Sequence, residues 1–202
     1  RNDPKLKVLD GHEVRTIFIG LDQASNGLKY SDVKGKNPFK DVRVRQALNL
    51  AVDREAIRRV TMRGLSLPAA IMVAPGVNGH SPDIDKAAPV DVERAKKLLA
   101  EAGYPAGFGL TLHGSNNRFP NDSQVAQALG QMFTRGGVKV NAVAVDYATE
   151  YVPKIFRSKA LFKGKNVDAA CHLVSGGGAA DALLYYLNFY TRNAAATATG
   201  TA

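Results

Sequence analysis

Apolar residues recur along this chain at two spacings, one typical of helices and one typical of strands. In residues 42–60, VRVRQALNLAVDREAIRRV, the helical spacing gives an apolar stripe that stops at Asp53 and then resumes. Asp53 stands where a capping carboxylate belongs, so the pattern predicts two consecutive helices. Similar stripes predict helices over 90–105 and 121–137, each of which stops at glycine.

Strand patterns alternate with these helices. Apolar residues occupy at least one alternating face in four segments: 14–21, 108–114, 138–146 and 167–174. Residues 147–159 predict a short helix that is interrupted at Pro153, and residues 183–190 can be helical. Because strands alternate with helices, the sequence predicts an α/β fold with a mixed or parallel sheet covered by helices.

Two segments lack this periodicity. Residues 65–90 contain four prolines and predict a long ordered loop that lies over a surface. Residues 193–202 have low complexity, and we expect them to form a flexible tail. Residues 1–192 are then expected to form a single folded unit.

Composition narrows the class of protein. With 202 residues and 45% hydrophobic content, the chain can bury a core of its own. It contains no apolar run of about 18 residues, the length at which a membrane-spanning helix is considered. The first eleven residues, RNDPKLKVLDG, lack the apolar segment of a signal peptide, so we expect a chain that is cytosolic, already processed or cut from something longer. The single cysteine, Cys171, excludes an internal disulfide.

The formal charge of +9 raises the possibility of a nucleic-acid-binding domain. Five arginines stand in residues 42–60, where they either contact nucleic acid or face water from a packed helix pair. The basic residues are spread along the chain, and aromatic residues do not interleave with them as on a base-stacking surface. This favours a solvated basic face, with nucleic-acid binding as the alternative.

Catalytic and metal-binding patterns are absent from the sequence. The four histidines lack metal-ligand spacing, so we expect no metal site and no cofactor. Cys171 and His172 are neighbours on a predicted strand and point to opposite faces, which disfavours a dyad. Ser175 lacks the glycine pattern of a nucleophile elbow. The chain is therefore not expected to be an enzyme, and a hydrolase using Ser175 or Cys171 is the third hypothesis.

Two loops follow strands at the edge where α/β sheets usually bind ligands. In the first, GSNNRFPND, Arg118 offers a forked donor suited to a carboxylate and has the ring of Phe119 beside it. In the second, SGGGAAD, Asp181 could accept from an ammonium group, although either charge could instead form a surface ion pair. The glycines of this loop bring backbone N–H groups to a surface that could be a binding wall, formed by Ser175, Gly176, Gly177 and Gly178.

Four blocks of the chain, in this order, resemble one protein family. They are NPFKDVRVRQALNLAVDREAI, DVERAKKLLAEAGYPAGFGLTLHG, GGVKVNAVAVDYATEY and VDAACHLVSGGGAADALLYYLNFY. They are similar to blocks of the extracytoplasmic solute-binding proteins of dipeptide and oligopeptide ABC transporters. The resemblance covers about residues 14–190 and corresponds to the C-terminal-side lobe of a two-lobed periplasmic-binding-protein fold.

The resemblance implies a function and a site. It implies that the arginines of 42–60 belong to a scaffold surface, that Arg118 lies near the carboxylate of a ligand, and that Asp181 takes its amino group. It also implies a monomeric, periplasmic or membrane-anchored protein that captures peptides or related small solutes. Its partners would be an ABC permease and an N-terminal lobe absent from this sequence, and nucleic acid would not be among them.

Overall fold

A computed structural model of the chain describes residues 5, 7, 9, 11, 13–156 and 169–177. The elements follow one another in this order: β1 (Arg15–Leu21), η1 (Pro38–Lys40), α1 (Val42–Ala51), α2 (Arg54–Ala56), η2 (Ile57–Thr61), α3 (Val92–Glu101), β2 (Phe108–Ser115), α4 (Asp122–Arg135), β3 (Val138–Val145), η3 (Tyr147–Phe156) and β4 (Cys171–Gly177). The predicted α/β class and most of the predicted elements are confirmed. The predicted helix over 183–190 and the predicted tail over 193–202 lie outside the described residues.

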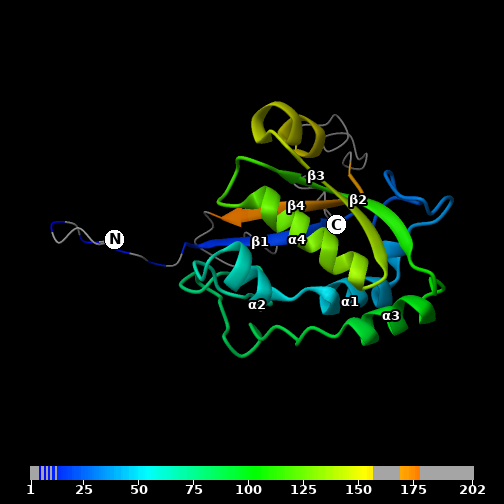
Figure 1. The fold of residues 1–202 in the computed structure, drawn as a ribbon, viewed down its shortest axis with the longest axis horizontal. Helices are drawn as coiled ribbons and strands as arrows, with labels where there is room; N and C mark the ends of the chain where they lie inside the picture. Colours follow the sequence, from blue (N-terminus) through cyan, green and yellow to red (C-terminus); the bar gives the residue numbers. More distant parts are fainter. Residues whose placement is uncertain are drawn as a thin grey trace.

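The four strands form one mixed sheet in the order β1-β4-β2-β3 (Figure 1). Strand β2 is parallel to both β3 and β4, whereas β1 runs antiparallel to β4. The last strand of the described residues, β4, therefore lies between β1 and β2. Because β2, β3 and β4 share one direction, their carboxyl ends lie at the same edge of the sheet.

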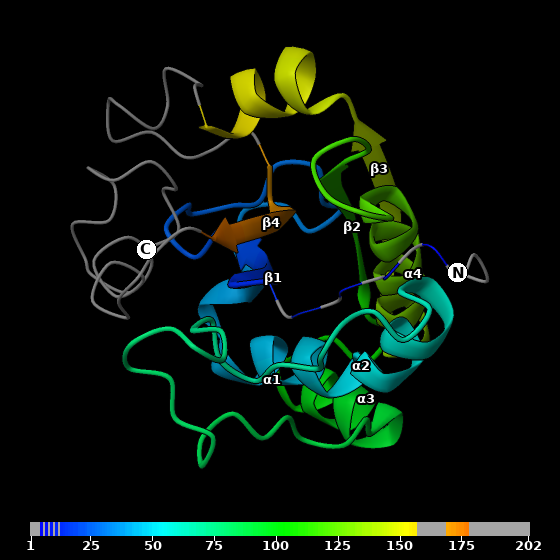
Figure 2. The ribbon, with the colours of Figure 1, turned by 90° about the vertical axis from the view of Figure 1, so that its left-hand side faces the viewer.

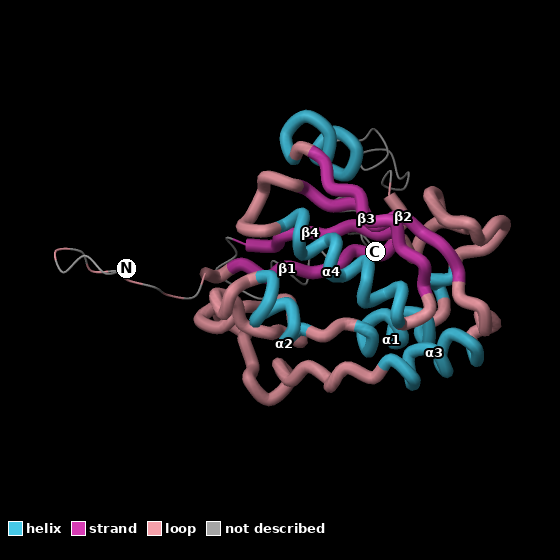
Figure 3. Tube along the Cα trace, viewed as in Figure 1, coloured by secondary structure: helices cyan, strands magenta, loops and turns pink. Residues whose placement is uncertain are grey.

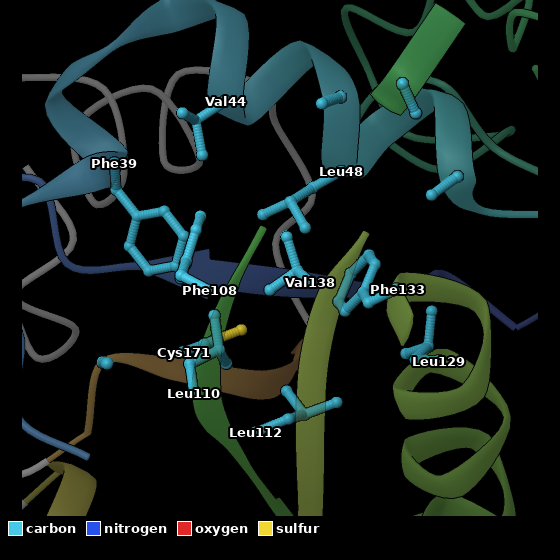
Figure 4. Close-up of a cluster of buried hydrophobic side chains, with 14 of the residues drawn as sticks. Phe39, Val44, Leu48, Phe108, Leu110, Leu112, Leu129, Phe133, Val138 and Cys171 are labelled. Carbon is cyan, nitrogen blue, oxygen red and sulfur yellow. The ribbon is translucent and has the colours of Figure 1, made fainter. Parts of the chain in front are cut away.

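Helices α1, α3 and α4 cover one face of this sheet (Figure 2). Alternate residues of β2 point toward these helices, and Leu112 is fully buried there. Side chains of the helices meet those of the strands in one core (Figure 4), which includes Phe39, Val44, Leu48, Phe108, Leu110, Leu112, Leu129, Phe133, Val138 and Cys171. On the opposite face, η3 packs its buried Tyr151 near Val145 of β3.

The segment over 42–60 forms the predicted pair of helices. Asp41 caps α1 by accepting from the N–H of Arg43, and Asp53 restarts the helix by accepting from the N–H of Ala56. Four of the five arginines are engaged by the chain itself. Arg43 binds Asp41 and the carbonyl of Glu101, Arg45 binds the carbonyl of Phe39, Arg54 binds that of Ala69, and Arg58 binds the carboxylate of Glu55. These contacts show a packed helix pair.

Residues 65–90 form a long connection without helix or strand, which Figure 3 draws as the loop that runs below the helices from η2 to α3. Hydrogen bonds to the side chain of Asp85 hold distant parts of this loop together. One carboxylate oxygen accepts from the N–H groups of Ala70 and Ile71, at 2.6 and 3.2 Å, and the other lies 3.1 Å from Nε2 of His80. This confirms the prediction of an ordered loop.

The loop after β1 completes the sheet where β4 is absent. Strand β4 is paired with β2 only from Leu112 onward, so the first half of β2 needs another partner. The N–H of Thr111 donates to the carbonyl of Tyr30, and the N–H of Asp32 donates to the carbonyl of Gly109. The side chain of Asp32 also accepts from the N–H of Gly109 at 2.7 Å. These bonds satisfy backbone groups that the sheet alone leaves open.

Some details of the predicted elements are wrong. The strand predicted over 167–174 begins only at Cys171, and it continues through Ser175, Gly176 and Gly177, because the antiparallel ladder with Arg15–Ile17 of β1 extends that far. The helix over 147–156 is not interrupted at Pro153, because wide turns, seen where the N–H of Tyr151 donates to the carbonyl of Asp146, leave room for the ring.

Cys171 should resist thiol reagents as long as the protein is folded. Its side chain is fully buried in the core, and burial raises the pKa of its thiol, so the reactive thiolate is disfavoured. We expect labelling by a maleimide or a disulfide reagent to be slow in buffer and fast in denaturant. Rapid stoichiometric labelling in buffer, measured by mass spectrometry, would contradict this placement.

Candidate functional site

The carboxyl edge of the sheet brings the loop after β2 and the end of β4 to one end of the molecule. Strands β2 and β3 end there at Ser115 and Val145, which are paired with each other, and β4 continues to Gly177. The antiparallel β1 begins at the same edge, where Arg15 pairs with Gly177. Figure 2 looks on to this end of the molecule. The site therefore lies where the topology of the sheet predicts one.

Hydrogen bonds join the loop after β2 to the segment after β3. The N–H of Asn116 donates to the carbonyl of Val145 at 3.0 Å. The side-chain amide of Asn117 donates to Asp146 at 2.6 Å, and its oxygen accepts from the N–H of Tyr147 at 2.8 Å. Asn117 thus bridges the two segments and fixes the spacing between them.

Arg118 projects from this loop over an aromatic ring. Its guanidinium carbon lies 5.0 Å from the ring centre of Tyr147, and the residue is exposed. No carboxylate of the described residues lies within ion-pair distance of Arg118. The ring orients the planar cation while its N–H groups stay available, so Arg118 can bind an external carboxylate in a bidentate manner.

The ring of Tyr147 is held in turn by Tyr151. The two rings stack at 5.8 Å between centres, and the hydroxyl of Tyr151 donates to the carbonyl of Leu173 in β4 at 2.6 Å. Tyr151 is buried, which raises the pKa of its phenol and keeps it neutral. A chain of contacts therefore runs from β4 through two tyrosines to Arg118.

Asp146 organises the start of η3. One carboxylate oxygen accepts from both the N–H and the hydroxyl of Thr149, each at 2.8 Å, while the other accepts from Asn117. These donors hold the pKa of Asp146 below its usual value, since each bond favours the ionised form. The carboxylate is thus occupied by internal donors.

Asp122 anchors the loop from below. Its side chain is buried, and one oxygen accepts from the hydroxyl of Ser115 at 2.7 Å and from the N–H of Arg118 at 2.8 Å. The other oxygen accepts from the N–H of Ser123 at 2.9 Å. This carboxylate fixes the backbone at the residue that carries the candidate cation.

The structure separates the predicted site residues into groups. Arg118 lies on the surface, whereas Phe119 is 9% exposed and packs in the hydrophobic core, where it anchors the loop. The backbones of Ser175, Gly176 and Gly177 lie in β4 at the same edge, as the end of an extended strand. The other two predicted residues, Gly178 and Asp181, lie outside the described residues.

Sequence reasoning did not single out Asn117, Asp122, Asp146 or Tyr147. A signal was present for Asp146, because an aspartate directly after a strand and three residues before Thr149 has the spacing of a helix cap. Asn117 and Tyr147 carry no such signal. Their roles depend on a contact between two loops that are separate in the sequence.

The edge forms an open wall. Two hollows among the described residues, of about 500 and 470 Å³, lie away from this edge, one beside Tyr30 and Asn141 and the other between α4 and β3. The described residues also contain no group of three or more His, Cys, Asp or Glu side chains placed to hold a metal ion. The arrangement can contact one side of a solute.

The sequence matches a known protein family over almost its whole length. The family model for bacterial extracellular solute-binding proteins, family 5 Middle, matches residues 1–196. The chain belongs to this family. The resemblance noted in the sequence is thereby confirmed, and the fold agrees with that of solved family 5 proteins.

Individual relatives bind different solutes according to their names. The family 5 chain is 32% identical over 154 residues to heme-binding protein A of Haemophilus influenzae, which covers 73% of this chain and 25% of that protein. It is 36% identical over 111 residues to the glutathione-binding protein GsiB of Shigella flexneri, or 55% of this chain and 21% of GsiB. The chain thus spans about a quarter of the length of these curated relatives.

A solved structure shows the same fold. The periplasmic binding protein DppA of Helicobacter pylori, in complex with the peptide STSA, superposes with a TM-score of 0.71 at 20% identity. The superposition covers 92% of the family 5 chain and 32% of DppA. Among the described residues of the family 5 chain, no helix combines the length and apolar character needed to cross a membrane.

Proposed function

We propose that the chain is one lobe of a two-lobed ABC-transporter solute-binding protein, formed by residues 1–192, and that its carboxyl edge is one wall of the ligand site. The observation that carries this proposal is Arg118, a cation oriented by Tyr147 that has no carboxylate of the described residues within ion-pair distance. An open wall of this kind needs a second wall to remove its ligand from water. The short span of the chain relative to its relatives supports a further lobe.

The ligands that suit this wall are peptides or related small solutes with a carboxylate. Arg118 would bind the carboxylate, and Asp181, which follows β4 in the sequence, would bind the amino group. The backbone of Ser175, Gly176 and Gly177 at the end of β4, with Gly178 next in the sequence, would line the space between them. The names of relatives, which bind glutathione or are bound to a peptide, support a ligand with a free carboxylate.

The proposed protein works outside the cytoplasmic membrane, as a monomer that delivers its solute to an ABC permease. The family's extracellular members support this location. The role is binding without catalysis, and no finding supports the alternative of a nucleic-acid-binding domain. Four of the five arginines that suggested this alternative are engaged by groups of the chain itself.

Replacing Arg118 with alanine should weaken solute binding by the full-length protein at least about tenfold. A charge buried in a closed cleft loses its partner in this variant, and such losses amount to about 2–5 kcal/mol. Calorimetry with glutathione, the peptide STSA or the best ligand of a thermal-shift peptide screen measures the effect. Asp181→Ala should act similarly on ligands with a free amine.

Arg58→Ala is the matched control, because Arg58 is an exposed arginine that pairs with Glu55 on the helix pair. This variant should bind like the wild type. Residues 1–202 alone should bind the same ligand much more weakly than the full-length protein, since half of the contacts are absent. Equal affinities for wild type and Arg118→Ala, or sub-micromolar binding by residues 1–202 alone, would refute the proposal.

A further inference from the structure

Three large aliphatic side chains face solvent in the short segment 58–67. The exposed fractions are 77% for Val60, 66% for Leu65 and 49% for Leu67. Single exposed aliphatic residues are ordinary, but three within eight positions of the sequence place unusual apolar area in water, where it is unfavourable. We call these three side chains the aliphatic patch.

Two arginines flank the aliphatic patch. Arg59 and Arg63 are exposed, and neither contacts a carboxylate among the residues that the structure describes. Arg58, in contrast, pairs with Glu55 at 3.3 Å. The surface therefore combines apolar area with two cations that are available to a partner, and it fits an apolar face that carries carboxylates.

This surface adjoins the candidate site. The side-chain amide of Asn121 donates to the carbonyl of Thr61 at 2.9 Å, and Asn121 follows Arg118 in the same loop. Figure 2 shows η2 and the segment after it on the end of the molecule where β4 ends. Strand β1 begins at the same edge, so the chain enters the sheet on the side of the patch.

We propose that the aliphatic patch and its two arginines form a surface that packs against the second lobe whether or not solute is bound. The inference rests on the proposed function and adds a specific contact outside the ligand site. The matched segments are 25% and 21% of the two curated relatives, so these proteins are about four to five times as long, and a second body of chain is available to cover the patch. The second lobe would have to contact the carboxyl edge of the sheet, because the candidate ligand site is open there.

Two other occupants fit the observations less well. A symmetric dimer would place the same patch of two copies face to face and bring four arginines together, which is unfavourable. A bilayer that took up the aliphatic side chains would block the site beside them. The second lobe avoids both difficulties, and it can supply the carboxylates for Arg59 and Arg63.

Hydrogen–deuterium exchange on residues 1–202 and on the full-length protein tests this contact without a ligand. Backbone amides of residues 59–67 should exchange at least tenfold more slowly in the full-length protein. The control is the segment around Ile84, which is 64% exposed and lies on the long loop, and its exchange should be unchanged. Equal exchange of residues 59–67 in the two proteins would overturn the proposal.

Variants give a second, independent readout. In the full-length protein, Val60→Asp with Leu65→Asp should abolish the protection of residues 59–67 and weaken solute binding at least fivefold, whereas Ile84→Asp should do neither. Unchanged protection in the double variant would overturn the inference. So would protection of residues 59–67 that depends on protein concentration, or that appears only with phosphatidylglycerol vesicles.

The two proposals can fail separately. Solute binding without protection of residues 59–67 would overturn the patch inference and leave the proposed function intact. Protection of these residues in a full-length protein that binds no solute would overturn the proposed function and support the contact between lobes.

Discussion

Replacing Gly107 with alanine should lower the free energy of unfolding by at least about 4 kcal/mol, the size seen only for severe structural conflicts. Gly107 has a φ of +69°, and a Cβ built on it would lie 1.7 Å from the carbonyl oxygen of Gly137. That oxygen belongs to the backbone between α4 and β3, so it cannot move aside alone. The turn before β2 would have to separate from the turn before β3.

Gly103→Ala is the matched control for this prediction. Gly103 has a φ of +90° in the same connection, but no atom lies within 4 Å of the position of its Cβ. In the control, the free energy of unfolding should therefore fall only by the penalty for placing alanine in a left-handed backbone conformation, about 1–2 kcal/mol. Urea unfolding followed by circular dichroism compares the two variants. Equal losses of unfolding free energy in the two variants would show that the close approach of Gly107 to Gly137 does not contribute to the effect.

Lowering the pH from about 6.5 to about 4 should destabilise the protein by up to about 3 kcal/mol through His172 alone. Burial in the sheet, with a smaller contribution from His113, lowers the pKa of His172 to about 4. In this window the unfolded chain binds a proton that the folded chain does not. Stability is therefore complete above the unfolded pKa and falls as the pH approaches the folded one.

Urea unfolding at several pH values tests this prediction. The carboxylates whose pKa values are lowered, including Asp41 at about 2, lose their contribution mainly below pH 4, so the two effects fall in different windows. The variant His172→Leu should still lose unfolding free energy below pH 4, but its unfolding free energy should not change with pH between 4 and 6.5. An unchanged slope between pH 4 and 6.5 in this variant would assign the effect to another group.

The sequence predicted the elements well because their causes are local. The stripe of α1, its cap at Asp41 and the restart at Asp53 depend on residues within a few positions of one another. The order of the strands is not local. Nothing near Cys171 shows that β4 lies between β1 and β2, and the extension of β4 to Gly177 depends on its distant partner, Arg15.

The site shows the same division. The position of Arg118 after a strand followed from the alternation of apolar residues. Its orientation by Tyr147 and the bridge from Asn117 to Asp146 depend on two loops that meet only in the folded sheet. The adjacent ring of Phe119 looked accessible in the sequence, but it is buried because the loop turns it toward the core. The sequence therefore predicted where the candidate site lies in the fold better than it predicted which side chains form its surface.

The central place of β4 also sets when the sheet can form during synthesis. Leu21 pairs with Cys171, so β1 cannot pair with its neighbour until nearly the whole described chain has been synthesised. At about 5–20 residues per second, a ribosome needs on the order of ten seconds or more to reach that point. Until then β1 and β2 each present an edge with no neighbour between them. Strands β2 and β3 can pair before this point, whereas β1 and β4 join the sheet together in a late step.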